Sequence, residues 1–180
     1  AMVAPSYLPD GMFDTSGIIN RTAVDVFEYK APSFSGFTPF YQRVETATDG
    51  NTNSAYKVNV VGVTYAAGPL AAGVTLKSTV GLPASAVKSN TEAFATYDLG
   101  VAKFGLGYDT KNNAAADQLL TSANAAKAAT SFGVAVPVGA LTVGANYAVR
   151  GTAKVTEFAA KYDLSKRTSL RLSSGKQSVD

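Results

Sequence analysis

The chain has 180 residues, a formal net charge of +3, and neither cysteine nor histidine. These absences exclude disulfides and thiol chemistry and remove the commonest general base and metal ligand. The excess of 16 basic over 13 acidic residues is too small and scattered to predict a nucleic-acid surface. No nucleophile elbow, phosphate loop or pair of carboxylates at one strand spacing occurs. We therefore expect no enzymatic activity, no metal, no cofactor and no nucleic-acid partner.

The chain is expected to form a single domain, residues 1–180, because no change of composition divides it. Residues 1–23 show no sustained periodicity, and their prolines and glycines predict a loop. From residue 24 to residue 175, apolar and polar residues alternate in runs separated by turn signals, which is typical of strands. The predicted strands are 24–30, 37–46, 56–66, 70–78, 93–99, 102–108, 131–136, 141–149, 155–164 and 168–174.

Between these strands lie two kinds of connection. Short turns follow some strands, whereas polar loops are predicted at 48–54 and 81–90. The longest connection, residues 110–130, is rich in asparagine and alanine and could hold a short helix. No run of about 18 apolar residues exists, so no transmembrane helix is expected.

A recurring hairpin unit is clearest at Ala93–Tyr108, which reads AFATYDLGVAKFGLGY and turns at Leu99-Gly100. Two alternating runs meet there, each with one apolar face and one small or polar face. Tyrosines recur just before the short turns at nearly constant spacing, and the hairpin of residues 134–144 carries valine in place of tyrosine. The recurring tyrosines are Tyr29, Tyr65, Tyr97 and Tyr162. The pattern predicts a repeated antiparallel meander.

The difference in length between the two sets of connections indicates the environment of the sheet. Short turns follow the tyrosines, and longer polar connections alternate with them. This sorting is typical of a transmembrane β-barrel, with short periplasmic turns and long extracellular loops. A sheet can span lipid only when it closes, because open edges leave backbone groups unsatisfied. The tyrosines then predict one aromatic girdle, and Tyr108 and Tyr147 predict the other.

The face opposite the tyrosines is predicted to line the lumen. The residues predicted to line the lumen by this alternation are Lys77, Glu92, Lys103, Asp109, Asn146, Arg150, Glu157, Lys161 and Arg171. On the first strands it adds Arg21, Glu28 and Arg43, while Asp25 and Lys57 fall outward unless a bulge intervenes. A wall with more basic than acidic residues would favour anions modestly.

The alternating faces also admit a bland interpretation, a solvated antiparallel sheet. In that case the chain would be a surface-exposed soluble β-domain, adhesin-like or passenger-like, without channel activity. Such a domain would have to bury a dry core against one face. The glycine, threonine and lysine of the inner face argue against a dry core.

Five phrases, in order, resemble the general (non-specific) porins of Gram-negative outer membranes, especially the β-proteobacterial type. They read VFEYKAPSFSGF, VTYAAGPLAAGVTL, ATYDLGVAKFGLGYDT, VAVPVGALTVGANYA and KYDLSKRTSLRL, and they span most of residues 20–175. The resemblance implies a 16-stranded barrel. It also implies a homotrimer in the outer membrane, in contact with lipid and lipopolysaccharide, that passes small hydrophilic solutes and ions.

The same resemblance implies roles for the first segment. Residues 1–23 would be the end of an inward-folded constriction loop, with Asp10 and Asp14 as its acidic residues. Arg21 and Arg43 would face them across the pore. The ten strands would be the sixth to the fifteenth of the barrel, so we expect the chain to be part of a longer one.

Overall fold

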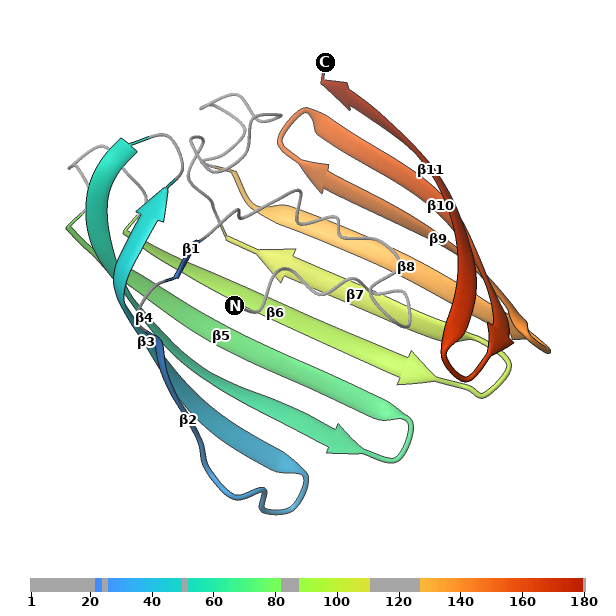
Figure 1. Cartoon of the computed structure of the whole chain (residues 1–180), viewed down its shortest axis with the longest axis horizontal. Helices are drawn as coiled ribbons and strands as arrows, with labels where there is room; N and C mark the ends of the chain where they lie inside the picture. The colour runs from blue at the N-terminus through green and yellow to red at the C-terminus, as the bar shows by residue number, and fades with distance from the viewer. Residues whose placement is uncertain (1–21, 24–25, 50–51, 82–87, 111–126, 180) are drawn as a thin grey trace.

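The computed structural model describes residues 22–23, 26–49, 52–81, 88–110 and 127–179. They form one antiparallel sheet in which β1 is followed by β3 and then by the strands in chain order to β11, while β2 also pairs with β3. Figure 1 shows this sheet strongly curved, with each strand returning beside the last. The strands are β1 (Thr22–Ala23), β2 (Val26–Lys30), β3 (Phe37–Asp49), β4 (Thr52–Ala67), β5 (Leu70–Val80), β6 (Ser89–Asp98), β7 (Lys103–Asp109), β8 (Ala129–Val138), β9 (Leu141–Arg150), β10 (Ala153–Ser165) and β11 (Thr168–Val179).

The predicted all-β antiparallel fold is confirmed. Within the described ranges there is no helix, and hence none long and apolar enough to cross a membrane. All ten predicted strands occur, and the first of them, 24–30, is β2. The end of the predicted loop 1–23 is corrected: residues 22–23 form the short strand β1, which also pairs with β3. The sequence allows a short helix in the 110–130 connection. Residues 111–126 of that connection lie outside the described residues.

The structure corrects the predicted loop lengths. β3 and β4 extend into the predicted polar loop 48–54, and only residues 50–51 separate them. β9 and β10 are separated only by residues 151–152. Among the connections between consecutive strands from β2 to β11, the longest are those of β5–β6 and β7–β8. Strand pairing continues past the predicted strand ends because polar residues can take part in a ladder whose side chains are solvated. A β-bulge in β3 lies between Val44 and Ala47.

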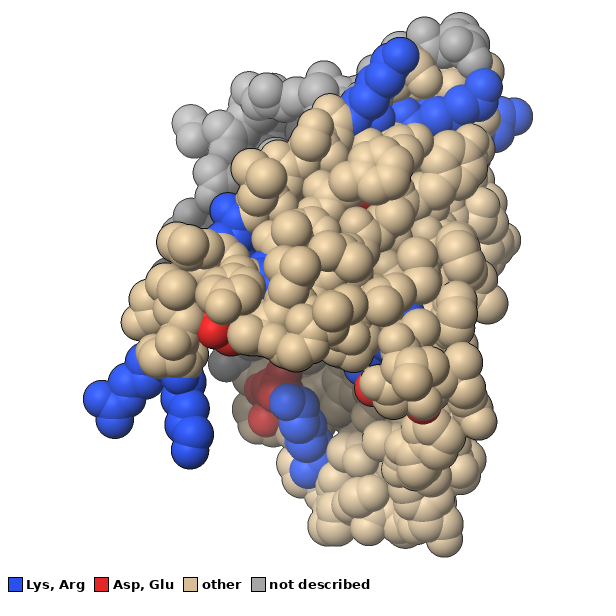
Figure 2. All heavy atoms as spheres, turned by 90° about the vertical axis from the view of Figure 1, so that its right-hand side faces the viewer, with Lys and Arg blue, Asp and Glu red and all other residues tan. Residues whose placement is uncertain are grey.

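The sheet separates its side chains into two unlike faces. We call the face that carries Tyr97 and Phe104 the apolar face, and the face that carries Glu92 and Asp109 the polar face. Every large hydrophobic strand residue that is exposed lies on the apolar face, Leu172 to 75% and Phe158 to 60%. Figure 2 views the right-hand side of Figure 1, and there uncharged residues form a broad field with lysine and arginine mainly at its margins.

The recurring tyrosines all lie on the apolar face, near the short turns. The ring of Tyr65 lies 4.7 Å from that of Phe37 between centroids. By contrast, the buried side chains all belong to the polar face and are mostly small: Val58, Val60, Thr75, Ala135, Asn146, Ala153 and Ala159. A sheet with this distribution exposes an apolar surface that requires a covering of lipid or of other protein.

Candidate functional site

The register brings the predicted lumen residues of β5 to β11 onto the polar face. Cross-strand partners share a face, so each position follows from the pairing. Glu92 pairs with Asp109, and Glu157 pairs with Asn146. The polar face carries ten of the predicted residues: Glu28, Lys77, Glu92, Lys103, Asp109, Asn146, Arg150, Glu157, Lys161 and Arg171. That these residues line a pore stays a prediction.

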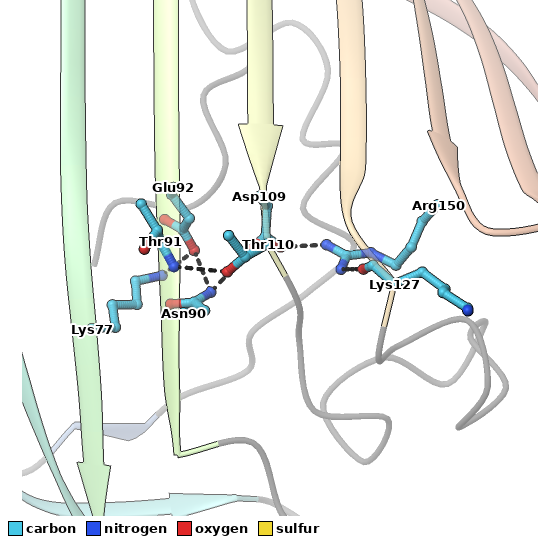
Figure 3. A network of polar contacts seen from close by, with 8 residues as sticks. All are labelled: Lys77, Asn90, Thr91, Glu92, Asp109, Thr110, Lys127 and Arg150. Carbon is cyan, nitrogen blue, oxygen red and sulfur yellow. Dashed lines mark hydrogen bonds and ion pairs between the residues drawn. The ribbon is translucent and has the colours of Figure 1, made fainter.

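A chain of polar contacts crosses the polar face near the long connections (Figure 3). Lys77 forms an ion pair with Glu92, and Arg150 forms one with Asp109. Asn90 stands between the two carboxylates: its Nδ2 donates to Glu92 Oε1 at 3.3 Å and to Asp109 Oδ1 at 3.2 Å. The paired carboxylates would repel one another if left alone. The two cations and the bridging amide make the arrangement stable.

Arg150 reaches Asp109 across an entire strand. The register places Ala129 of β8 directly between them. Strands lie about 4.8 Å apart, so only a small residue at this position leaves the guanidinium a path to the carboxylate. Sequence periodicity predicted the face of Arg150 and Asp109 but not this contact, because it depends on the register of three strands.

The same network holds both ends of the β7–β8 connection. Arg150 Nη1 donates to the backbone oxygen of Lys127 at 2.8 Å. At the other end, Thr91 N donates to Thr110 Oγ1 at 2.9 Å, and Thr110 N donates to Thr91 O at 3.0 Å. These polar contacts therefore hold both ends of the β7–β8 connection against the sheet.

A second group of charges lies on the polar face near the short turns. Glu28 pairs with Lys30 at 3.0 Å and accepts from Gln42 at 2.8 Å. Lys161 pairs with Asp163 at 3.1 Å. Three charged residues of the polar face were not predicted from the sequence: Lys30, Asp98 and Asp163. Lys30 and Asp163 continue the period-two phase of a predicted residue, and Asp98 faces the predicted Lys103 across a turn.

These additions change the charge balance of the polar face. Among strand residues whose side chains the structure describes, the acids there are Glu28, Glu92, Asp98, Asp109, Glu157 and Asp163. The basic residues are Lys30, Lys77, Lys103, Arg150, Lys161 and Arg171, an equal number. The expected excess of basic over acidic residues on this face is therefore not present in the described strands.

Between the two charged groups, the polar face of β7 to β9 is lined mostly by small residues. Asn146 is 3% exposed and pairs with Gly133 on one side and with Glu157 on the other. Gly105 and Gly175 extend this row in both directions. Small side chains keep this part of the wall thin. No group of three His, Cys, Asp or Glu residues in the described ranges could hold a metal ion.

The prediction that Arg43 lies on the lumen face is wrong. Arg43 pairs with Asn59 and Phe27 and shares the face of Tyr41, which is the apolar face. Two hydrogen bonds agree with this placement: Arg43 Nη1 donates to Asn59 Oδ1 at 2.6 Å, and Tyr41 OH donates to the same oxygen at 3.0 Å. Lys57 also lies on the apolar face, as its phase predicted. Asp10, Asp14, Arg21 and Asp25 lie outside the described residues.

The sequence matches the family model of the Gram-negative porin over residues 5–180. One similar solved structure is a Rhodobacter porin, with 19% identity and a TM-score of 0.64 over 86% of this chain and 56% of the other. Another is the anion-selective porin from Comamonas acidovorans, with 21% identity and a TM-score of 0.61 over 86% of this chain and 49% of the other. The chain thus spans about half the length of these structures. No curated protein matches it.

Proposed function

The chain belongs to the Gram-negative porin family, and from this premise we propose that it forms an outer-membrane diffusion channel for small hydrophilic solutes and ions. Proteins of this family are integral to the bacterial outer membrane, and so is this chain. The observation that carries the proposal is the separation of the two faces. Exposed large hydrophobic residues of the strands lie on one face, and the strand acids whose side chains the structure describes lie on the other. A barrel that conducts water-soluble solutes needs this division.

The polar face suits a conducting wall. Eight of its twelve described strand charges form ion pairs, such as Lys77 with Glu92 and Arg150 with Asp109, which limits the fixed charge that could trap a passing ion. On β7 to β9 its middle is lined by small residues such as Gly105 and Gly133, which leave space inside the barrel. We propose no catalytic role for any residue of this wall.

A finer proposal is a modest preference for anions. Lys103 and Arg171 lie on the polar face near the short turns, outside the four ion pairs described among the strands. Four of the six described acids of this face, Glu28, Glu92, Asp109 and Asp163, each lie in one of those pairs, and a fifth, Asp98, lies opposite Lys103 across the β6–β7 turn. One structurally similar protein is named as an anion-selective porin. Because the described wall charges balance, we expect the preference to be small and to depend on these two cations.

The family also supports two proposals beyond the described residues. We propose that the channel assembles as a homotrimer in contact with lipid and lipopolysaccharide. We propose further that residues 1–23 are the end of a constriction loop, with Asp10, Asp14 and Arg21 near the narrowest point of the pore.

Single-channel recording of the intact protein in a planar lipid bilayer, under a salt gradient, tests these proposals. Insertions in three equal steps are expected from a trimer, with a reversal potential that favours anions. Lys103→Gln should shift that potential toward cations. Lys176→Gln removes the same charge from the apolar face, so it should leave the potential unchanged. Silence from folded protein would refute the channel, whereas cation preference would refute only the anion proposal.

A further inference from the structure

The turn between β10 and β11 carries more charge than the other short turns of the sheet. Among the short turns that the structure describes, those of β2–β3, β4–β5 and β8–β9 contain no charged residue, and at the β6–β7 turn Asp98 lies opposite Lys103. The β10–β11 turn, by contrast, consists of Lys166 and Arg167. It lies at the same end of the sheet as the other short turns (Figure 1). This hairpin therefore gives that end an excess of positive charge.

The strands beside this turn bring two further cations together. Lys161 of β10 lies directly opposite Arg171 of β11, and both belong to the polar face. Like charges in directly opposite positions destabilise a pair of strands, because their Cβ atoms lie only about 5 Å apart. The acid nearest to them in the sequence, Asp163, forms an ion pair with Lys161 at 3.1 Å. Residues 161–171 thus contain four basic residues and one acid, a net charge of 4 − 1 = +3.

Arg171 is the cation of this pair whose charge is not balanced. Its side chain is exposed and forms no ion pair or hydrogen bond with the part of the chain that the structure describes. The next acid on these two strands, Glu157, lies beyond the row formed by Ala159 and Ser173. The guanidinium of Arg171 is a planar fork of donors, and that geometry matches two oxygens of a phosphate or a carboxylate.

The surroundings of the two cations suit an oxyanion from the lumen. Thr142 lies opposite Lys161 on its other side, and Ser173 is the next residue of the polar face after Arg171. Their hydroxyl groups can donate hydrogen bonds to an anion without adding charge. Because the polar face is turned away from the exposed hydrophobic residues, an occupant arrives through water and is a solute rather than a lipid.

We propose that Arg171 and Lys161 form a binding site for a small oxyanion on the lumen side of the β10–β11 hairpin. Lys166 and Arg167 raise the local concentration of anions beside it. The site rests on the proposed function, because a water-filled lumen is what brings solutes to this face. It goes beyond a modest anion preference, which is a property of the charge of the whole wall. A site made by two neighbouring cations saturates with its ligand and distinguishes an oxyanion from chloride.

The test measures binding of inorganic phosphate by the intact protein, folded in an amine-oxide detergent, from the width of the phosphorus-31 resonance. The wild-type protein should broaden that resonance in a saturable way, and chloride at equal ionic strength should compete only weakly. Arg171→Gln should weaken phosphate binding about fivefold, as expected for one cation about 4 Å from an anion in a high dielectric. Arg171→Lys should lose less, because it keeps the charge and removes only the planar fork.

Two further variants separate this site from a general effect of charge. Asp163→Asn should tighten phosphate binding about twofold, because it removes the acid that competes for Lys161. The matched control is Lys30→Gln, which removes a cation that is also on the polar face near a short turn, but on β2. It should bind phosphate as the wild type does. Circular dichroism and gel mobility without boiling check that each variant is folded.

Unchanged phosphate binding by folded Arg171→Gln would overturn the site, and so would an equal loss of binding in Lys30→Gln. Recording of the same proteins in a planar bilayer distinguishes this failure from failure of the proposed function. If the wild type conducts and Arg171→Gln binds phosphate as well as it does, the channel stands and the site does not. If the wild type binds phosphate through Arg171 but never conducts, the anion site stands and the channel does not.

Discussion

At the scale of single residues, the two aromatic rings whose side chains the structure describes on the polar face, Phe40 and Phe94, each lie opposite a glycine. Phe94 pairs with Gly73, and a Cβ on that glycine would lie 2.4 Å from a carbon of the ring. Gly73→Ala should therefore force the ring out of place and lower the free energy of unfolding by about 1–3 kcal/mol. Denaturant unfolding of the protein in detergent micelles, followed by circular dichroism, measures the loss.

Gly175→Ala provides the control for that substitution. Gly175 lies on the same face, but the atom nearest to its Cβ is the flexible Cγ of Glu157 at 3.2 Å. The cost there should be clearly smaller than at Gly73. If the two variants lose equal stability, the contact with the Phe94 ring is not what requires glycine at position 73.

The same residue-scale packing explains where sequence reasoning failed. On β3, Tyr41 and Phe40 point to opposite faces, so alternation alone gives no sign of which is outward. Phe40 can turn inward because Gly62 lies opposite it, where a Cβ would approach the ring to 2.4 Å. That pairing places Arg43 outward. It depends on the register between β3 and β4, which the period of either strand does not reveal.

At the scale of elements, the hairpins depend on their turns. In the β6–β7 turn, Leu99 N donates to Ala102 O at 2.8 Å, and Asp98 Oδ1 accepts from Gly100 N at 2.8 Å. Gly100 has a φ of +79°, in the left-handed region, and nothing lies within 4 Å of its Cβ position. Gly100→Val should thus cost about 1–2 kcal/mol through backbone strain alone.

The same unfolding measurement distinguishes strain from crowding at this turn. Gly100→Asn should cost markedly less than Gly100→Val, because asparagine enters the left-handed region more readily. The surrounding space is open, so side-chain size should not matter. An equal loss for the two variants would show that the turn does not impose this conformation on residue 100.

Element order and the faces of β5 to β11 were predictable from sequence because regular strands keep their phase between turns. Glu92 and Asp109, for example, follow from period two and one hairpin turn. The ends of β3, β4, β9 and β10 were not predictable, because polar residues continue a ladder wherever the partner strand is also extended. The contact of Arg150 with Asp109 was also hidden, since it passes over Ala129 of a third strand.

At the scale of the whole molecule, the division into two faces determines which environment each face requires. The polar face contains the small buried residues and the strand acids whose side chains the structure describes, and the apolar face contains the exposed aromatic and aliphatic residues of the strands. Ion pairs such as Arg150 with Asp109 stabilise the wall locally without giving it a net charge. The exceptions to the division are four cations of the apolar face: Arg43, Lys57, Lys154 and Lys176. They lie toward one end of the sheet, where charge is least costly to a barrel in lipid.

Two adjacent residues of β11 test this division directly. Leu172 is 75% exposed on the apolar face, and its neighbour Ser173, also exposed, lies on the polar face opposite Ala159. Leu172→Arg should destabilise the protein folded into phosphatidylcholine bilayers by about 2–4 kcal/mol, because a guanidinium there enters hydrocarbon. Ser173→Arg should cost far less, because its charge enters the aqueous lumen. Urea titration of the bilayer-folded protein measures both. Equal costs would mean that the apolar face does not lie in lipid, and that the exposed aromatic and aliphatic residues of β2 to β11 contact protein instead.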